Sequence, residues 1–354
     1  MLTAAGVPIR AGVPVLIYPG DTTLYDWGEK DMVPFEELPY TYNPECGFVA
    51  SANNKVVSDD YPYYFGTWYA LPNRINRIRE LLEAEEKHSV ESFKAMQSDQ
   101  VSAFARRMTP VYVDVLDGNV DGIYAEALEI LKSWDYNMDK SLAAPLIFDE
   151  MFAQLTHSIF RDELDDEQYK VFNSSLMLAR NHIYNLAETM ESLWCDDVTT
   201  NDRVENFSDN IIKAFIATID TLNYKAGSEL NSWRWGDFLT LTIMHPMGEV
   251  GIVNKLFNPN LGPFASGGSF HTIAVKRYNP GSNYKVVHGA SERLVYSVGD
   301  WDNSRTVIPT GTSGVPASPY YGNQTKMYMN FEYHADPFSK EAVKRMGMYT
   351  AVFK

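Results

Sequence analysis

The chain has 354 residues, of which 45% are hydrophobic and 21% charged, and its formal net charge is −16. This length allows one large domain or two packed lobes, with ample apolar material for a core. The negative charge argues against binding of nucleic acid or of anionic membrane surfaces, because both would repel the chain. No run of about 18 apolar residues occurs, so no membrane span is predicted.

Two further features of composition limit which folds and sites are possible. Residues 120–200 hold 16 acidic residues against five Lys or Arg, which we expect on exposed helix faces. Cys46 and Cys195 are the two cysteines of the sequence. Two cysteines exclude a disulfide framework and multi-cysteine zinc patterns, and they leave one long-range disulfide open.

Residues 1–72 are predicted to form short β segments broken by Pro and Gly. The runs 7–10 and 13–18 are strand-like, and Phe48 to Ala50 predicts a short buried strand after a tight backbone position at Gly47. Asn53 and Asn54 follow, where this strand gives way to a loop. Their plainest interpretation is a turn, because Asn tolerates left-handed backbone. The alternative is an amide donor held at a strand end and aimed at a substrate.

Residues 73–247 are predicted to be mainly helical, with about six or seven helices. Apolar residues recur at spacings of three and four from Ile75 onwards, Pro72 stands just before that helix, and Ser89 is a predicted N-cap for the next. The second helix is expected to include Val101. Further helices are predicted near 123–134, 143–160, 176–194 and 208–222.

Residues 248–354 are predicted to be rich in β structure again. Strands are expected over 271–275, 285–287, 293–298 and 348–353, with short helices over 324–331 and from Ser339. The predicted class is therefore α+β. In the simplest packing the two β parts share one sheet system, and the helical block is an excursion from it.

The common short motifs of catalytic and metal sites are absent from the sequence, although residue order leaves a Ser-His-Asp triad open. None of the seven histidines forms the spacing of a zinc helix, and no Gly-x-Ser-x-Gly elbow, P-loop or Gly-x-Gly-x-x-Gly is present. Asp99 is interpreted as a helix-surface or capping carboxylate. Trp233-Arg-Trp-Gly236 is interpreted as structural packing, with Arg234 stacked on an indole.

Asn53 and Arg74 remain as a candidate pair. Arg74 is expected in the first turn of a helix, where it could reach back to orient the Asn53 amide or hold a carboxylate. A structural salt bridge is the alternative for this arginine, and the pair by itself is only suggestive.

An ordered set of motifs across nearly the whole chain resembles the C-terminal part of the β subunit of penicillin acylases, which are amidases of the N-terminal-nucleophile class. No motif is specific alone, but their joint order is. The motifs are the segment from Trp27 to Pro34-Phe35, Asn43-Pro-x-x-Gly-Phe-Val-Ala-x-x-Asn-Asn54, Arg74 with Arg77-Ile78 and Leu81-Leu82, Trp134-Asp135 with Ser141-x-Ala-Ala144, Trp233-x-Trp-Gly236 with His245-Pro246, Gly299-Asp-Trp-Asp-Asn-Ser304, Pro309-Thr-Gly-x-Ser-Gly314 and Asn323-Gln-x-Lys-Met-Tyr-x-Asn-Phe331.

The resemblance implies an αββα sandwich with a large inserted helical block, and an enzyme that hydrolyses linear amides. In that family the N-terminal serine of the β subunit is the nucleophile and its own α-amine is the base. By register, Asn53 matches the oxyanion-binding asparagine, and Arg74 matches the arginine that positions the amide and the amine. The implied substrates are small-molecule acyl amides, namely β-lactam side-chain amides or acyl-homoserine lactones. No cofactor is required, and a structural calcium ion is allowed in the full-length protein.

The chain departs from the family pattern at one decisive point: no serine matches the nucleophile. We therefore expect a portion of a larger precursor that hydrolyses nothing alone and whose partner is the segment or small subunit with that serine. The alternative is a non-catalytic binding module derived from the same fold. By resemblance, the location is periplasmic or extracellular.

Overall fold

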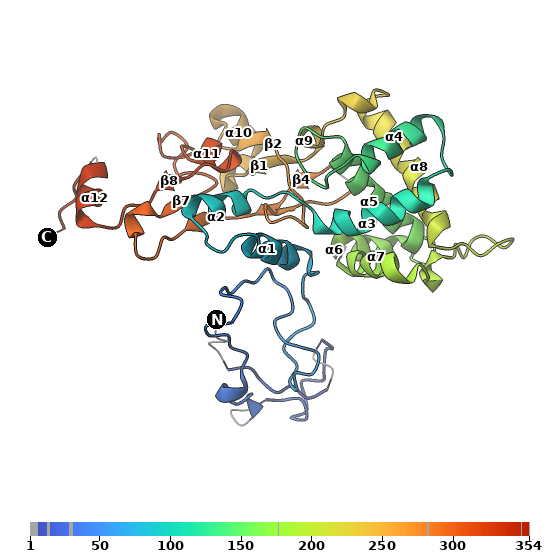
Figure 1. Cartoon of the computed structure of the whole chain (residues 1–354), viewed down its shortest axis with the longest axis horizontal. Coiled ribbons are helices and arrows are strands. Elements are labelled where there is room, and N and C mark those ends of the chain that lie inside the picture. The colour runs from blue at the N-terminus through green and yellow to red at the C-terminus, as the bar shows by residue number, and fades with distance from the viewer. Residues whose placement is uncertain are drawn as a thin grey trace. The chain divides into compact units, whose positions relative to one another are not determined.

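The computed structural model describes residues 6–12, 15–27, 31–175, 177–281, 283–347 and 349–353. The chain separates into two compact units, Met1–Glu85 and Glu86–Lys354. The sequence predicts a different division, into the three parts 1–72, 73–247 and 248–354. This three-part division stays a prediction. Helix α1 belongs to the first unit, and the other helices and strands labelled in Figure 1 belong to the second.

The first unit contains little regular structure besides α1 (Asn73–Glu83) and a 3₁₀ turn over Phe35–Glu37. The strand predicted for Phe48 to Ala50 does not form, and Val49 is exposed rather than buried. The described residues of the run 7–18 contribute one isolated bridge, between Pro8 and Met32. The prediction was wrong here because a strand needs a neighbour for its backbone groups, and apolar sequence alone supplies none. Residues 13 and 14 lie outside the described residues.

The helical part of the chain follows the predicted periodicity, with more helices than expected. Nine α-helices are described between residues 73 and 240 instead of six or seven. After α1 they are α2 (Val90–Gln97), α3 (Ala103–Leu116), α4 (Gly122–Lys132), α5 (Ala144–Phe160), α6 (Asp166–Ser175), α7 (Met177–Thr189), α8 (Phe207–Ala226) and α9 (Trp235–Phe238).

One predicted helix is in fact two. Val101 pairs with Asn137 in an isolated bridge, so α2 ends at Gln97 and α3 begins after Ser102, whose side chain accepts the Ala105 N–H. Ser89 caps α2 as predicted, in a capping box with Ser92. The helix predicted over 176–194 ends at Thr189; position 176 is not described.

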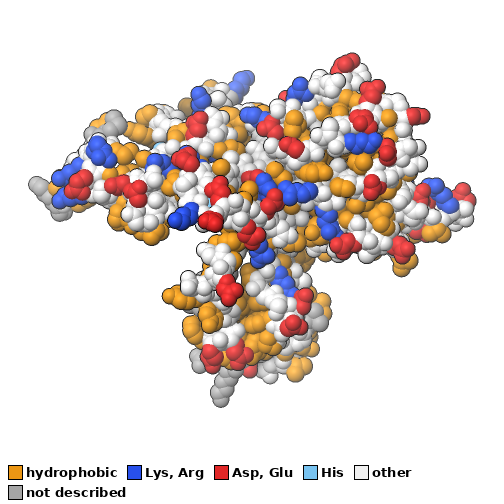
Figure 2. Space-filling view, viewed as in Figure 1, with side chains coloured by type: hydrophobic (Ala, Val, Ile, Leu, Met, Phe, Trp, Pro, Cys, Tyr) orange, Lys and Arg blue, Asp and Glu red, His pale blue; other side chains and the backbone are white. Residues whose placement is uncertain are grey.

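The centre of the helical part is the pair α5 and α8, which pack against each other along their lengths (Figure 1). Ile147, Met151 and Leu155 of α5 are fully buried, as are Ile211 and Phe215 of α8. Helix α5 also buries Asp149 and Glu150, so the expectation that acid in this block coats helix surfaces fails for these two. Other carboxylates of the block, such as Glu126 and Glu129, are exposed, and Figure 2 shows Asp and Glu spread over this part.

The strands are short and form three small sheets in the orders β2-β1-β4, β3-β5 and β6-β7-β8. Their bounds are β1 Thr240–Ile243, β2 Leu261–Ala265, β3 Lys276–Arg277, β4 Lys285–Val286, β5 His288–Gly289, β6 Arg293–Val295, β7 Arg305–Val307 and β8 His334–Ala335. Helices α10 (Gly251–Phe257), α11 (Thr325–Met329) and α12 (Lys340–Met346) lie among them, and the last two match predicted helices.

Two predicted C-terminal strands are not found. Residues 271–275 form bends, because the Thr272 hydroxyl bonds the nearby Ser269 and Ala274 backbone instead of a ladder. Residues 349–353 have no strand partner, and position 348 lies outside the described residues. Among the described residues, all three sheets are formed by strands of the second unit, and a sheet system common to the N-terminal and C-terminal parts is not found there. Among the described helices, none is both long and apolar enough to cross a membrane.

Candidate functional site: the Asn53 amide and Arg74

Asn53 lies in a bend of the chain, called the Asn53 turn below, whose backbone conformation suits asparagine. Its φ angle is 62°, in the left-handed region that Asn adopts more readily than most residues. The Ala70 N–H donates to the Asn53 carbonyl at 2.9 Å, which holds the turn against the segment that leads into α1. The left-handed backbone that the turn interpretation assumes for asparagine is thus present, and the Asn53 side chain lies at the surface.

Arg74, in the first turn of α1, reaches back to this turn. Its Nη2 donates to the Asn53 Oδ1 at 3.0 Å and to the Ala52 carbonyl at 2.9 Å. The guanidinium is half-buried, and burial lowers the pKa of Arg74, yet arginine stays protonated in proteins. The contact that the sequence suggests between Asn53 and Arg74 is thus present. The salt bridge offered as the alternative is not: no carboxylate lies within 4 Å of the Arg74 guanidinium among the described residues.

The contact with Arg74 fixes which way the Asn53 amide faces. A guanidinium has donors and no acceptor, so the amide oxygen must face Arg74 and the Nδ2 group must point the other way. No acceptor for this Nδ2 is found among the described residues. Asn53 consequently presents an N–H donor whose orientation is set by a charged neighbour.

The adjacent Asn54 is engaged differently. Its Oδ1 accepts the Ala52 N–H at 3.0 Å, and its Nδ2 donates to the Lys55 carbonyl at 2.8 Å. Both ends of this amide therefore bond the local loop. Of the two neighbouring amides, Asn53 is the one that remains available to a ligand.

A cavity of about 420 Å³ adjoins the loop that holds this pair. Its walls include Phe48, Val49 and Ala50, together with Asn54, Lys55 and Arg79. The segment predicted as a strand thus lines a hollow instead of pairing in a sheet.

The other residues singled out from the sequence make local hydrogen bonds or pack in the core. Asp99 follows α2, and its Oδ1 accepts the Val101 N–H at 3.2 Å. Trp233 and Trp235 are buried, as expected for structural packing, and the Trp235 indole N–H donates to the Gly268 carbonyl at 3.1 Å. Arg234 does not stack on an indole; its Nη1 donates to the carbonyls of Asn231 and Trp233 instead.

The structure leaves both cysteines as free thiols, Cys46 exposed and Cys195 buried. Burial raises the pKa of the Cys195 thiol to about 11. Three or more His, Cys, Asp or Glu side chains placed to hold a metal ion are not found anywhere in the described ranges. A structural calcium ion in the full-length protein stays a prediction from the resemblance.

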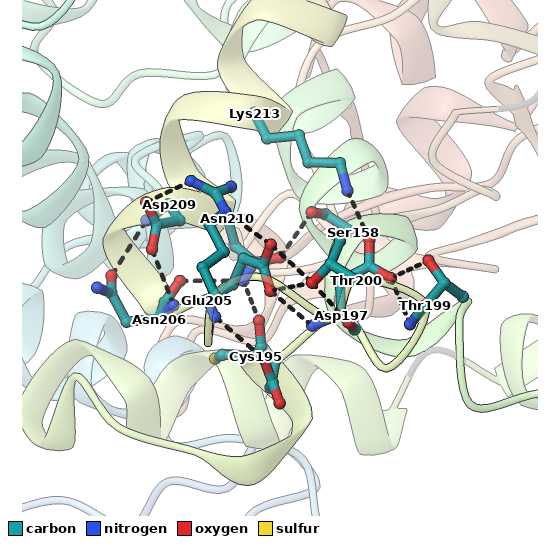
Figure 3. Close-up of polar contacts among 12 residues, drawn as sticks. Ser158, Cys195, Asp197, Thr199, Thr200, Glu205, Asn206, Asp209, Asn210 and Lys213 are labelled. Carbon is teal, nitrogen blue, oxygen red and sulfur yellow. Dashed lines mark hydrogen bonds and ion pairs between the residues drawn. The ribbon is translucent and has the colours of Figure 1, made fainter.

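Several acidic side chains gather instead in a hydrogen-bonded network between η3 (Leu193–Cys195) and α8, shown in Figure 3. Glu205 accepts from Arg203 and Thr200, and Asp197 accepts from Thr199 and Lys213. Each of these carboxylates is occupied by nearby donors, so the network holds the loop to the helix and offers no open ligand set.

The sequence did not reveal the buried ionisable groups of the second unit. Asp149 on α5 accepts from the Tyr278 hydroxyl at 2.8 Å, and burial raises the pKa of Asp149 to about 7. Lys276 and Arg293 are also buried. No motif or spacing marks these residues, because their partners lie far away along the chain.

Comparison with known proteins assigns this chain to a family. The family model named penicillin amidase matches residues 1–345. The chain belongs to the penicillin amidase family. Among curated relatives, acyl-homoserine lactone acylase QuiP of Pseudomonas aeruginosa is 25% identical over 369 residues, with 95% of this chain and 42% of QuiP covered. Penicillin acylase 2 proenzyme of Pseudomonas sp. strain SE83 is 28% identical over 332 residues, with 89% of this chain and 40% of the proenzyme covered.

The fold agrees with this membership. A thermostable penicillin G acylase from Alcaligenes faecalis superimposes with a TM-score of 0.61 at 16% identity, covering 99% of this chain and 64% of that chain. The predicted fold class, α+β as part of an N-terminal-nucleophile fold, is confirmed by this match. This penicillin amidase family member spans less than half the length of the curated relatives that it matches.

Proposed function

We propose that this chain supplies the oxyanion-binding part of an amidohydrolase that cleaves linear amide bonds. The observation that carries the proposal is the Arg74–Asn53 contact, which turns the Asn53 Nδ2 away from the guanidinium. Family membership supports the reaction class. The relatives named above act on acyl-homoserine lactones and on penicillin, and we propose acylated amines of these two kinds as substrates.

The proposed chemistry assigns one role to each residue. When a serine hydroxyl attacks an amide carbonyl, the carbonyl oxygen becomes negatively charged, and the Asn53 Nδ2 would donate to it. Arg74 would act as a positioning residue, since it holds the amide oxygen and so prevents the side chain from turning over. No residue of this chain matches the nucleophilic serine. We propose that the serine and its α-amine base come from a segment or subunit outside these 354 residues.

The proposal also covers the cofactor requirement, the cellular location and the activity of the isolated chain. The chemistry needs no cofactor, since serine and its amine provide nucleophile and base. A periplasmic or extracellular location is proposed from the resemblance to exported acylases. The chain by itself is expected to be inactive.

The test is reconstitution. Co-expression of this chain with the serine-bearing segment of a relative should give turnover of a chromogenic acyl amide. In that complex Asn53→Ala should lower kcat by roughly 10²–10³-fold, the usual effect of losing one oxyanion donor. Unchanged turnover in Asn53→Ala would show that the oxyanion assignment is wrong.

Asn54→Ala is the matched control, because it removes a neighbouring amide that bonds only the loop. It should retain kcat within a few fold. Turnover by the isolated chain would contradict the proposal of an external nucleophile. A complex that binds the amide without ever cleaving it would favour the non-catalytic binding module instead.

A further inference from the structure

The second unit contains a cavity of about 340 Å³ whose wall carries two buried cations. Lys276 is 3% exposed and Arg293 is 6% exposed. They come from different sheets: Lys276 lies in β3, paired opposite Gly289, and Arg293 begins β6, paired opposite Val307. Both side chains point inward, while their neighbours Arg277 and Leu294 are exposed. We call this hollow the cationic cavity.

Neither cation is neutralised by a carboxylate. Among the described residues, no acidic oxygen lies within 4 Å of the Lys276 or Arg293 nitrogens, and no hydrogen-bond acceptor is found for the Lys276 Nζ. Its ammonium lies 5.9 Å from the centroid of the Tyr328 ring. A buried charge without a partner is costly, so proteins seldom retain one without a ligand or a function.

Arg293 is held in place, but within the part of the chain that the structure describes its guanidinium still has N–H groups without a hydrogen-bond acceptor. Its Nη1 donates to the Tyr328 carbonyl at 2.7 Å, and its guanidinium lies 4.0 Å and 4.2 Å from the Tyr328 and Phe331 ring centroids. Contacts with ring faces leave the edge of the guanidinium, where the remaining N–H groups lie, for a polar partner. A planar carboxylate matches such an edge by accepting two parallel hydrogen bonds.

The other polar groups of the wall are compatible with an anion. Gln100 has a buried Oε1 without a partner, and its amide can turn by 180° to present NH₂ groups. Asp139 and Lys140 are the other charged residues of the wall. The Asp139 Oδ1 already accepts the Ser141 N–H at 2.8 Å and the Ser141 hydroxyl at 2.6 Å. The Asp139 carboxylate therefore bonds its neighbour Ser141 rather than either of the two cations.

We propose that the cationic cavity is an anion-binding site for a small carboxylate, with Lys276 and Arg293 as its ligands. All residues of the cavity belong to the second unit, and the proposal does not depend on the function proposed for Asn53. The carboxylate is either a free small molecule or a side chain of a segment outside this chain. Desolvation and the nearby Arg293 lower the pKa of Lys276 to about 8, so a bound carboxylate should raise it again.

The test uses the 354-residue chain with sodium acetate as the probe, against sodium chloride at equal ionic strength and pH 7. Calorimetry should show saturable acetate binding. Lys276→Met, which keeps the length of the side chain without the charge, should weaken it at least tenfold. Lys285→Met, at an exposed lysine of β4, should leave it unchanged. Equal binding by the wild type and Lys276→Met, or no saturable binding, would overturn the site.

Two measurements need no variant. Acetate affinity should fall between pH 7 and pH 9.5 as Lys276 loses its proton while Arg293 stays charged. Inorganic phosphate that binds more than tenfold tighter than acetate would overturn the choice of a carboxylate. Acetate binding that persists when the serine-bearing segment is co-expressed assigns a free ligand, and binding lost on co-expression assigns a side chain of that segment.

Discussion

At the scale of single residues, neighbouring groups determine how a side chain is oriented and whether it ionises. Asn53 and Asn54 have identical side chains, yet only Asn53 faces a guanidinium that orients it outward. Asp149 is an acid whose burial opposes ionisation, with the Tyr278 hydroxyl and the charge of Arg180 only partly offsetting that effect. These differences follow from neighbours that are up to 129 positions away in sequence.

Asp149 gives a pH prediction. The pKa of its carboxyl is raised from 3.8 to about 7, so the folded state binds a proton that the unfolded state releases between these values. Its contribution to stability is present at low pH and is lost as pH rises towards 7. Relative to Asp149→Asn, the wild type should lose about 2–3 kcal/mol of unfolding free energy between pH 5 and pH 8.

Chemical denaturation at several pH values measures this difference. The asparagine variant keeps an oxygen that can accept from Tyr278, so the comparison isolates the titration. A difference that is independent of pH, or that grows in the opposite direction, would contradict the assignment of the raised pKa to Asp149.

At the scale of elements, a few polar contacts hold helices and loops in register. Asn210 on α8 is buried, and its Nδ2 donates to the carbonyls of Cys195 and Asn206 at 2.7 Å and 3.0 Å. Its Oδ1 accepts from Ser158 of α5 at 2.6 Å, so a single amide connects both central helices and η3 (Figure 3). The start of α8 is further closed by the Asn206–Asp209 capping box.

Asn210→Ala should therefore destabilise the chain by about 2–3 kcal/mol, because it leaves a buried carbonyl and a hydroxyl without partners. Asn223→Ala, at an exposed position of the same helix, is the control and should change stability by less than about 0.5 kcal/mol. Urea denaturation of both variants measures the difference. Equal losses in the two would exclude a specific role for Asn210.

The end of α8 gives a second prediction for elements. Gly227 has φ 85° and ψ 167°, a conformation that essentially only glycine adopts, and nothing would contact an added Cβ. Gly227→Ala should cost about 1–3 kcal/mol through backbone strain alone. Gly251→Ala, at the start of α10 with equally open space and no positive φ, should be neutral or slightly stabilising. Thermal melts compare the two, and a similar effect of both substitutions would refute the backbone argument.

At the scale of the whole molecule, regular structure and burial are unevenly distributed between the two units. The second unit contains the closely packed α5–α8 pair, whereas the described residues of the first unit form mostly irregular chain before α1. Backbone amides in packed helices open rarely, and amides of loops with few internal hydrogen bonds exchange quickly.

Hydrogen exchange followed by mass spectrometry should therefore show the slowest exchange in peptides from α5 and α8. Peptides from residues 40–70 should exchange fastest. The reference is the same chain in denaturant, where both sets exchange at their intrinsic rates. Slow exchange over 40–70 in the native chain would contradict the irregular structure described for that segment.

The sequence by itself determined the helical block and the joint placement of Asn53 and Arg74. Helical hydrogen bonds connect residues four apart, so periodicity from Ile75 and a cap such as Ser89 are sufficient local signals. The pairing of Asn53 with Arg74 was suggested by the predicted helix position of Arg74 and then by the resemblance. The structure supplies the contact, while its catalytic role stays a prediction.

Only the tertiary structure decided which apolar runs become strands and which charges are buried. Phe48 to Ala50 has strand-like sequence but no pairing neighbour, whereas Arg293-Leu-Val295 pairs with β7 and turns its arginine, not its leucine, inward. Strand pairing and the burial of Lys276 or Asp149 depend on groups distant in sequence. Local pattern contains no information on those groups, because their proximity exists only after the chain has folded.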